Sequence, residues 1–117
     1  MRIGERDAAV ALLRDMVTTW PKDEATLEGL QLLGDDAFAR KDLSNARADF
    51  EASLLSHDPQ TKIYAHYRLA WCSWAEGHHP DAITQMSAVA ADNSDPTLAK
   101  RAAEDLGRMR ADGAPRR

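Results

Sequence analysis

Apolar and polar residues nowhere alternate along the chain as they do in a half-buried strand. Ala, Leu, Arg and Glu, which favour helices, dominate the sequence together with Asp. Apolar residues recur instead at the spacing of helix faces. The pattern predicts an all-α chain.

Prolines and short polar turns divide this helical pattern. They stand where a helix starts or has just ended: Pro21, Pro59, Pro80 and Pro96, with turns at 42–44 and 77–80. We therefore expect six helices, at residues 5–19, 23–40, 44–56, 60–76, 80–92 and 96–111. We place them in a single domain over residues 1–112, followed by a flexible C-terminal tail at 113–117.

The chain repeats itself at an interval of 36 to 37 residues. The clearest landmark is a Leu followed by a small residue, at Leu33-Gly34, Leu69-Ala70 and Leu106-Gly107. Other residues recur at the same interval: Ala46 and Ala82, Phe50 and Met86, Phe38 and Trp74, and Pro59 and Pro96. A period in the thirties, in which each unit is a helix-turn-helix, is typical of stacked repeats that bury one another's apolar faces.

The segment that begins LQLLGDDAF resembles a tetratricopeptide (TPR) repeat. The positions that carry the resemblance are Leu30, Leu33, Gly34, Ala37, Ala46, Phe50, Ser53 and Pro59. A second unit follows with His66, Leu69, Ala70, Ser73, Gly77, Ala82, Met86, Val89 and Pro96. Ala9, Leu13, Met16 and Pro21 match the second helix of a preceding unit, and Leu106-Gly107 the first helix of a following one. The resemblance implies an α-solenoid of antiparallel helix hairpins, with two full repeats and flanking half-repeats.

Four aromatic residues gather on one side of the helix expected at 60–76. Tyr64, Tyr67, Trp71 and Trp74 fall within an arc of about 80° on a helical wheel. In the TPR family the first helices of successive repeats line a concave groove that receives peptides. The resemblance therefore implies that this aromatic row faces such a groove. The alternative is that the next first helix covers the rings, which would make them part of the core.

The same places in the neighbouring units complete the predicted groove. They are Glu28, Gln31, Asp35 and Phe38 on one side, and Arg101, Glu104, Arg108 and Ala111 on the other. Acidic residues beside aromatic rings suit a basic segment, through cation-π contacts of roughly 0.5 to 2 kcal/mol each, and aromatic ledges also suit Pro-rich peptides. The expected partner is another protein or peptide, which presents a basic or Pro-rich segment.

Charge and composition narrow the function further. The chain is 44% hydrophobic and 29% charged, which is the balance of a soluble globular protein. Residues 1–95 hold 9 Lys and Arg against 16 Asp and Glu, and this acidic body argues against nucleic-acid binding. No apolar run approaches the roughly 20 residues that a bilayer requires, so we expect no membrane insertion. The absence of a visible signal sequence favours the cytoplasm over secretion and leaves the compartment open.

Candidate chemistry is sparse, and we expect neither catalysis nor a metal or other cofactor. His78 and His79 are adjacent on a predicted solvated turn, and neighbouring turn residues usually point apart. His66 is expected to be a core histidine with a hydrogen bond. Cys72 and His66 lie six residues and about 120° apart on the wheel, which does not suit a Cys-His pair.

The sequence therefore predicts a non-catalytic protein-interaction module that binds a partner segment in its groove. A second hypothesis is that the chain is a segment of a larger scaffold, or a homo-oligomer that assembles through its ends, because half-units stand at both ends. A third is an enzyme or ligand-sensing helical domain, which a bound metal or small molecule would reveal.

Overall fold

The computed structural model describes residues 3–20 and 23–112, with side chains from residue 8 onward. Pro21 and the predicted tail at 113–117 lie outside the described residues. Within them the chain forms six α-helices and no strand, which confirms the all-α prediction. The helices are α1 (Ile3–Thr19), α2 (Glu24–Ala39), α3 (Leu43–Ser53), α4 (Pro59–Ala75), α5 (His79–Ala90) and α6 (Pro96–Asp112).

Aspartates begin four of these helices. Asp23, Asp42 and Asp58 each accept a hydrogen bond from a backbone N–H of the first turn, and Asp95 does the same for Leu98. These side chains satisfy amide groups that a helix start leaves without an intrahelical partner. The predicted end of the third helix was three residues too late, because residues 54–56 form tighter bonds back to residues 51–53.

The turns after α2 and α4 have the same geometry. Lys41 and Gly77 stand 36 residues apart and have positive φ angles of 63° and 87°. The N–H that follows each one bonds to a carbonyl five residues back, from Asp42 to Ala37 and from His78 to Ser73. This is a helix C-terminus that turns through a left-handed residue. The repeat seen in the sequence therefore has a counterpart in the backbone.

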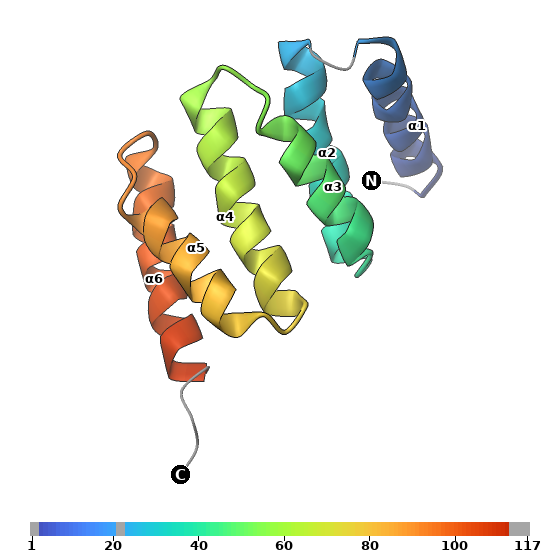
Figure 1. Ribbon diagram of the computed structural model, residues 1–117. Helices are drawn as coiled ribbons and strands as arrows, with labels where there is room; N and C mark the ends of the chain where they lie inside the picture. Colours follow the sequence, from blue (N-terminus) through green and yellow to red (C-terminus); the bar gives the residue numbers. More distant parts are fainter. Residues whose placement is uncertain (1–2, 21–22, 113–117) are drawn as a thin grey trace.

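Each helix packs mainly on its neighbours in the chain, and consecutive helices run in opposite directions (Figure 1). The most extensive contacts join α2 with α3, α4 with α5, and α5 with α6, while α2 also touches α4. Helices α1 and α6 lie at opposite ends of the molecule (Figure 1). The result is an elongated row of helices, 50 × 29 × 22 Å.

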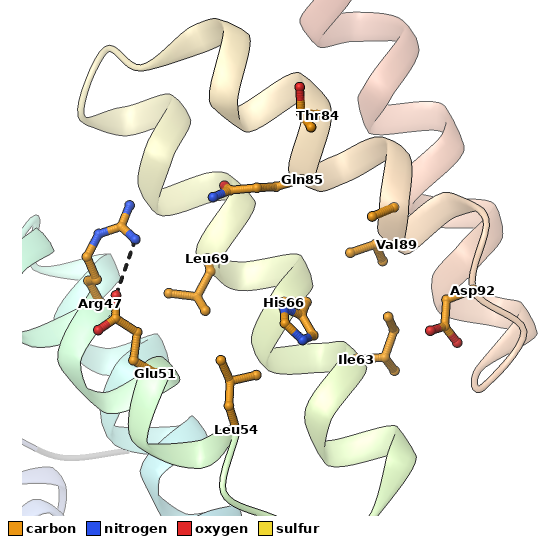
Figure 2. Close-up of a pocket in the computed structure, with 11 residues that line it drawn as sticks. Arg47, Glu51, Leu54, Ile63, His66, Leu69, Thr84, Gln85, Val89 and Asp92 are labelled. Atoms are coloured by element: carbon orange, nitrogen blue, oxygen red, sulfur yellow. Dashed lines mark hydrogen bonds and ion pairs between the residues drawn. The ribbon is translucent and has the colours of Figure 1, made fainter.

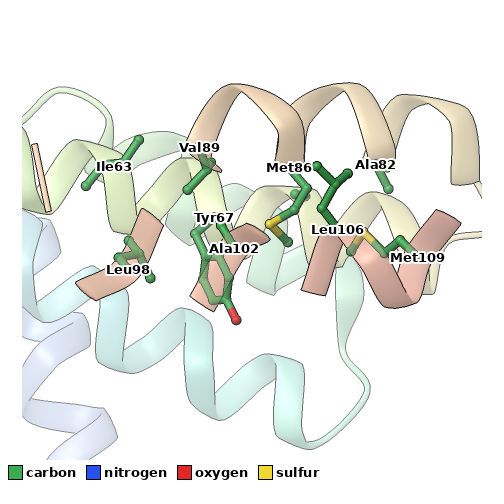
Figure 3. Close-up of a cluster of buried hydrophobic side chains, with 10 residues drawn as sticks. Ile63, Tyr67, Ala82, Met86, Val89, Leu98, Ala102, Leu106 and Met109 are labelled. Carbon is green, nitrogen blue, oxygen red and sulfur yellow. The ribbon is translucent and has the colours of Figure 1, made fainter. Parts of the chain in front are cut away.

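The core follows this row as three apolar clusters. One lies between α1 and α2, around Leu27, Leu30 and Leu33. The second lies between α2, α3 and α4, around Phe50 and Leu69. The third and largest joins α4, α5 and α6 (Figure 3). The repeated leucines Leu33, Leu69 and Leu106 are all buried, each in a different cluster.

Helix α1 is attached to the row by one apolar stripe and one ion pair. Val10, Leu13 and Val17 pack against the leucines of α2. Arg14 donates two hydrogen bonds, of 3.0 and 3.3 Å, to the buried carboxylate of Asp49 on α3. Burial raises the pKa of Asp49, and the bonds from Arg14 oppose that rise.

Candidate partner-binding face

Two of the predicted groove residues of α2, Gln31 and Asp35, lie directly against α4. The phenol of Tyr64 donates to the Asp35 carboxylate at 2.8 and 3.0 Å, and Gln31 Nε2 donates to the Thr61 carbonyl at 2.7 Å. Arg68 Nε forms an ion pair with Asp35 at 3.1 Å, without the alignment of a hydrogen bond. Burial and then the bond to Asp35 raise the pKa of Tyr64 to about 12. The Asp35 carboxylate thus already has a hydrogen-bond donor and an ion-pair partner within its own chain.

The junction between α4 and α6 is built on Tyr67. Its side chain is 2% exposed, and its phenol donates to the buried carboxylate of Asp105. Burial and then this bond raise the pKa of Tyr67. The guanidinium of Arg101 lies 5.7 Å from the centre of the same ring. Tyr67 therefore belongs to the core, which is the second of the two placements that the sequence allowed.

The other three rings of the aromatic row stay partly accessible. Tyr64, Trp71 and Trp74 are half-buried and pack against the α4–α5–α6 cluster. The Trp74 ring stacks on His79, with 3.9 Å between ring centres. His79 is the first residue of α5 and not a fully solvated turn residue, whereas His78 is exposed. Phe38 is also half-buried, with the Arg68 guanidinium 4.5 Å from its ring centre.

Charged residues surround these rings. Glu28 on α2 is exposed, as are the four positions predicted on α6: Arg101, Glu104, Arg108 and Ala111. The Arg108 side chain is 76% exposed and lies 3.9 Å from Asp105. We call the predicted positions on α2, α4 and α6 that stay at least partly accessible the α2/α4/α6 face. It comprises Glu28, Gln31, Asp35, Phe38, Tyr64, Trp71, Trp74, Arg101, Glu104, Arg108 and Ala111.

A cleft of about 690 Å³ lies elsewhere, between α3 and α5 with α4 as its floor (Figure 2). We call it the α3/α5 cleft. Its lining combines apolar and polar side chains: Arg47, Glu51, Leu54, Ile63, His66, Leu69, Thr84, Gln85, Ala88, Val89 and Asp92. The expectation that His66 is a core histidine was wrong, because His66 is exposed at this cleft. Helices α3 and α5 leave a strip of α4 open between them, and His66 lies on that strip (Figure 2).

A chain of polar side chains closes one end of the α3/α5 cleft. Arg47 of α3 donates to Ser73 Oγ at 3.0 Å and forms an ion pair with Glu76, and Ser73 donates to Gln85 Oε1 of α5 at 2.7 Å. Hydrogen bonding to Arg47 lowers the pKa of Glu76. This link joins three helices, and its partners are separated by 26 residues (Arg47 and Ser73) and by 12 residues (Ser73 and Gln85). No local sequence motif predicts it.

The described residues offer little for covalent or metal chemistry. Cys72 is fully buried, and burial raises the pKa of its thiol, so the reactive thiolate is disfavoured. Within residues 3–20 and 23–112, no group of three or more His, Cys, Asp or Glu side chains is placed to hold a metal ion. In the same part of the chain no helix has the length and apolar character that crossing a membrane requires.

Comparison with known proteins gives no relative for this chain. No family model matches it, and no curated protein or solved structure matches it either.

Proposed function

We propose that the chain is a TPR-like α-solenoid that binds a segment of another protein on its α2/α4/α6 face and performs no catalysis. The observation that carries this proposal is the face itself. Three half-buried rings of α4 lie in one row, beside Phe38 of α2 and between exposed charges of α2 and α6. Large aromatic residues with polar surroundings are common anchors at protein interfaces. The matching turns after α2 and α4 support the TPR-like architecture.

The chemistry of the face favours one kind of partner segment. Because Asp35 is occupied by Tyr64 and Arg68, the acidic character available to a partner comes from Glu28 and Glu104. Arg101 and Arg108 add positive charge at the α6 side. A segment with a Pro or apolar side chain over Trp71, and a Lys or Arg directed towards α2, fits this distribution.

Substitution of the two tryptophans tests the proposal. Trp71→Ala with Trp74→Ala removes the aromatic contact area, whereas Tyr67 must be kept because it is buried. The double variant should lose partner capture from extracts of the source cell. It should also lose the binding of dye-labelled Pro-rich or Lys/Arg-rich peptides that the wild type shows by fluorescence anisotropy. Circular dichroism checks that its helices persist.

A matched variant in the α3/α5 cleft separates the cleft from the α2/α4/α6 face as binding sites. His66→Ala and Leu54→Ala alter the cleft and leave the α2/α4/α6 face unchanged. This variant should bind like the wild type. If it loses the partner while the tryptophan variant keeps it, the binding site is the cleft, and the proposed face is wrong.

A second candidate function is assembly through the ends of the row, as part of a larger scaffold or as a homo-oligomer. The exposure of large apolar side chains near one end favours it. Leu12 of α1 and Leu32 of α2 are 64% and 63% exposed. Light scattering at increasing protein concentration separates this candidate from partner binding, since only assembly raises the mass of the isolated chain.

A further inference from the structure

Helix α1 exposes a face that is buried on α3, the equivalent helix of the next repeat. Three positions of α3 are covered by the helices around it: Ala46 (0% exposed), Asp49 (6%) and Ser53 (0%). The positions 37 residues earlier, on α1, are Ala9, Leu12 and Met16. Ala9 and Leu12 are exposed and Met16 is half-buried. We call these three residues the open face of α1.

Helix α6 has the complementary property. Three positions of α2 are buried: Leu30, Gly34 and Ala37. Leu30 lies in the cluster that α1 packs against, and α3 covers Gly34 and Ala37. The positions 73 residues later, on α6, are Ala103, Gly107 and Arg110, and all three are exposed. We call them the open face of α6. Among the described residues, no helix follows α6 and none precedes α1.

The glycines show the contrast most directly. A Cβ added to Gly34 would lie 2.7 Å from the Phe50 ring, so α3 approaches α2 closely at this point. A Cβ added to Gly107 would meet nothing within 4 Å. Gly107 and Ala103 therefore present a shallow surface of the kind that receives Phe50 on α2. The α1 residue that corresponds to Phe50 is Leu13, which packs against α2 of its own chain. The α1 side chains left for a contact with α6 are therefore those of the open face.

We propose that α6 of one copy of this chain packs against α1 of a second copy, and forms across the junction the helix pair that α2 and α3 form within the chain. The open face of α6 corresponds to a surface of α2 that packs against α3, and the open face of α1 corresponds to a surface of α3 that is buried in the row. Within the described residues the two open faces are therefore equivalent to the two halves of an interior contact. The apolar side chains of Leu12 and Met16 supply the area that association removes from water.

Charge complementarity supports a second copy as the occupant. Inside the chain, Asp35 of α2 contacts Tyr64 and Arg68 of the next first helix, α4. The same repeat register places Arg108 of one copy against Glu28 and Leu32 of the next. Arg108 and Glu28 have opposite charges and both are exposed. Glu28 takes the place that Tyr64 has in the interior, so the junction pairs the Arg108 cation with an anion where Asp35 meets the Tyr64 phenol.

This contact joins two different surfaces, so it leaves one open face of each kind at the ends of every oligomer. Such a heterologous interface continues into longer rows unless the rotation closes a ring. The protein should therefore form a concentration-dependent series of oligomers and not a closed dimer. The inference needs no second protein, and it rests on the second candidate function, assembly through the ends of the row. Because Glu28 and Arg108 also belong to the α2/α4/α6 face, the variants at Gly107 and Leu12 are the ones that separate assembly from partner binding on that face.

Two blocking variants test the junction. Gly107→Glu places a charged side chain on the open face of α6, and Leu12→Glu does the same on α1, at positions whose side chains are outside the core. In light scattering the wild type should rise above the monomer mass of 12.9 kDa as concentration increases, and each variant should stay at that mass. Leu55→Glu, at a leucine 59% exposed outside both α1 and α6, is the control and should assemble like the wild type.

Mixing the variants gives the decisive result. The Leu12→Glu variant keeps a functional α6 face and the Gly107→Glu variant a functional α1 face, so an equimolar mixture should form a heterodimer and stop there. A wild type that stays monomeric to about 1 mM, or a mixture that does not associate, would overturn the proposal. Assembly that both blocking variants retain would overturn it as well, because the contact would then lie elsewhere.

An exchange of the two charges tests the register of the junction between α6 of one copy and α1 of the next. Arg108→Glu and Glu28→Arg should each weaken assembly, and the chain that carries both should regain part of it, because the pair is restored with reversed sign. Circular dichroism and urea unfolding of each variant show that its helices are intact. Equal weakening by the double variant and by either single one would contradict the register in which Arg108 meets Glu28.

Discussion

The α2–α3 pair and the helix α6 carry the same sequence landmark in opposite surroundings. Gly34 follows Leu33 and is filled by the Phe50 ring, whereas Gly107 follows Leu106 and faces open space. The two leucines are both buried, so within the described residues the difference is whether a second helix covers the neighbouring glycine. A repeat landmark therefore specifies which face of a helix is able to pack, and the neighbouring element decides whether that face is covered.

The interior pair should lose the most stability when its filling residue is truncated. Phe50 is 0% exposed and contacts α2 and α4, so Phe50→Ala should lower the free energy of unfolding by about 3–5 kcal/mol. Leu12→Ala on the open face of α1 should change it by less than about 0.5 kcal/mol in dilute solution. Urea unfolding of both variants measures the contrast, and similar losses would show that the two regions do not differ as described.

Polar junctions of the interior should show the next largest effect. Tyr67→Phe leaves the buried Asp105 carboxylate without the phenol that donates to it, and should cost about 1–3 kcal/mol. Tyr64→Phe should cost less, because Asp35 keeps its ion pair with Arg68. Thermal unfolding of the two variants at neutral pH ranks them. A larger loss for Tyr64→Phe would place the more important junction between α2 and α4.

The two glycines should respond to alanine with opposite signs. Gly34→Ala forces the Phe50 ring to shift, and overpacking of this kind typically costs about 1–3 kcal/mol, which outweighs the gain in helix propensity. Gly107→Ala meets no neighbour and should stabilise α6 by about 0.5–1 kcal/mol. Urea unfolding at low protein concentration keeps assembly from contributing. Stabilisation at both positions would mean that α3 lies farther from α2 than described.

Most of the fold was accessible from the sequence because its determinants are local. Prolines and aspartates mark helix starts, and the six helices begin and end within three residues of the predicted bounds. The period of 36 to 37 residues reappears in the turns at Lys41 and Gly77. The TPR-like solenoid itself stays a prediction, because no family model or solved structure matches the chain.

The candidate site was harder to predict because its details depend on how helices are spaced. A helical wheel places Tyr67 and Tyr64 on one side of α4, but only the position of α6 determines that Tyr67 is buried. Likewise, His66 is exposed because α3 and α5 leave a strip of α4 open, and the sequence contains no signal for that separation. The role of these surfaces in binding stays a prediction.

The smallest expected effect concerns a junction that ties the start of α2 to the loop before α4. Glu24 accepts hydrogen bonds from Ser56 Oγ at 2.6 Å and from the His57 backbone N–H at 2.8 Å. The bond from His57, followed by the one from Ser56, lowers the pKa of Glu24 from its ordinary value of 4.5. A lowered pKa in the folded state means that the carboxylate favours folding above pH 4.5, and that this contribution is lost as the pH falls through the folded-state value.

Glu24→Gln should therefore make unfolding less dependent on pH below about 5, with a small loss of stability at pH 7. The assembly measured by light scattering should stay unchanged at neutral pH, because Glu24 belongs to neither open face. Thermal unfolding of the wild type and the variant between pH 3 and pH 7 gives the comparison. Parallel curves for the two proteins would show that the Glu24 junction contributes nothing to the pH dependence of stability.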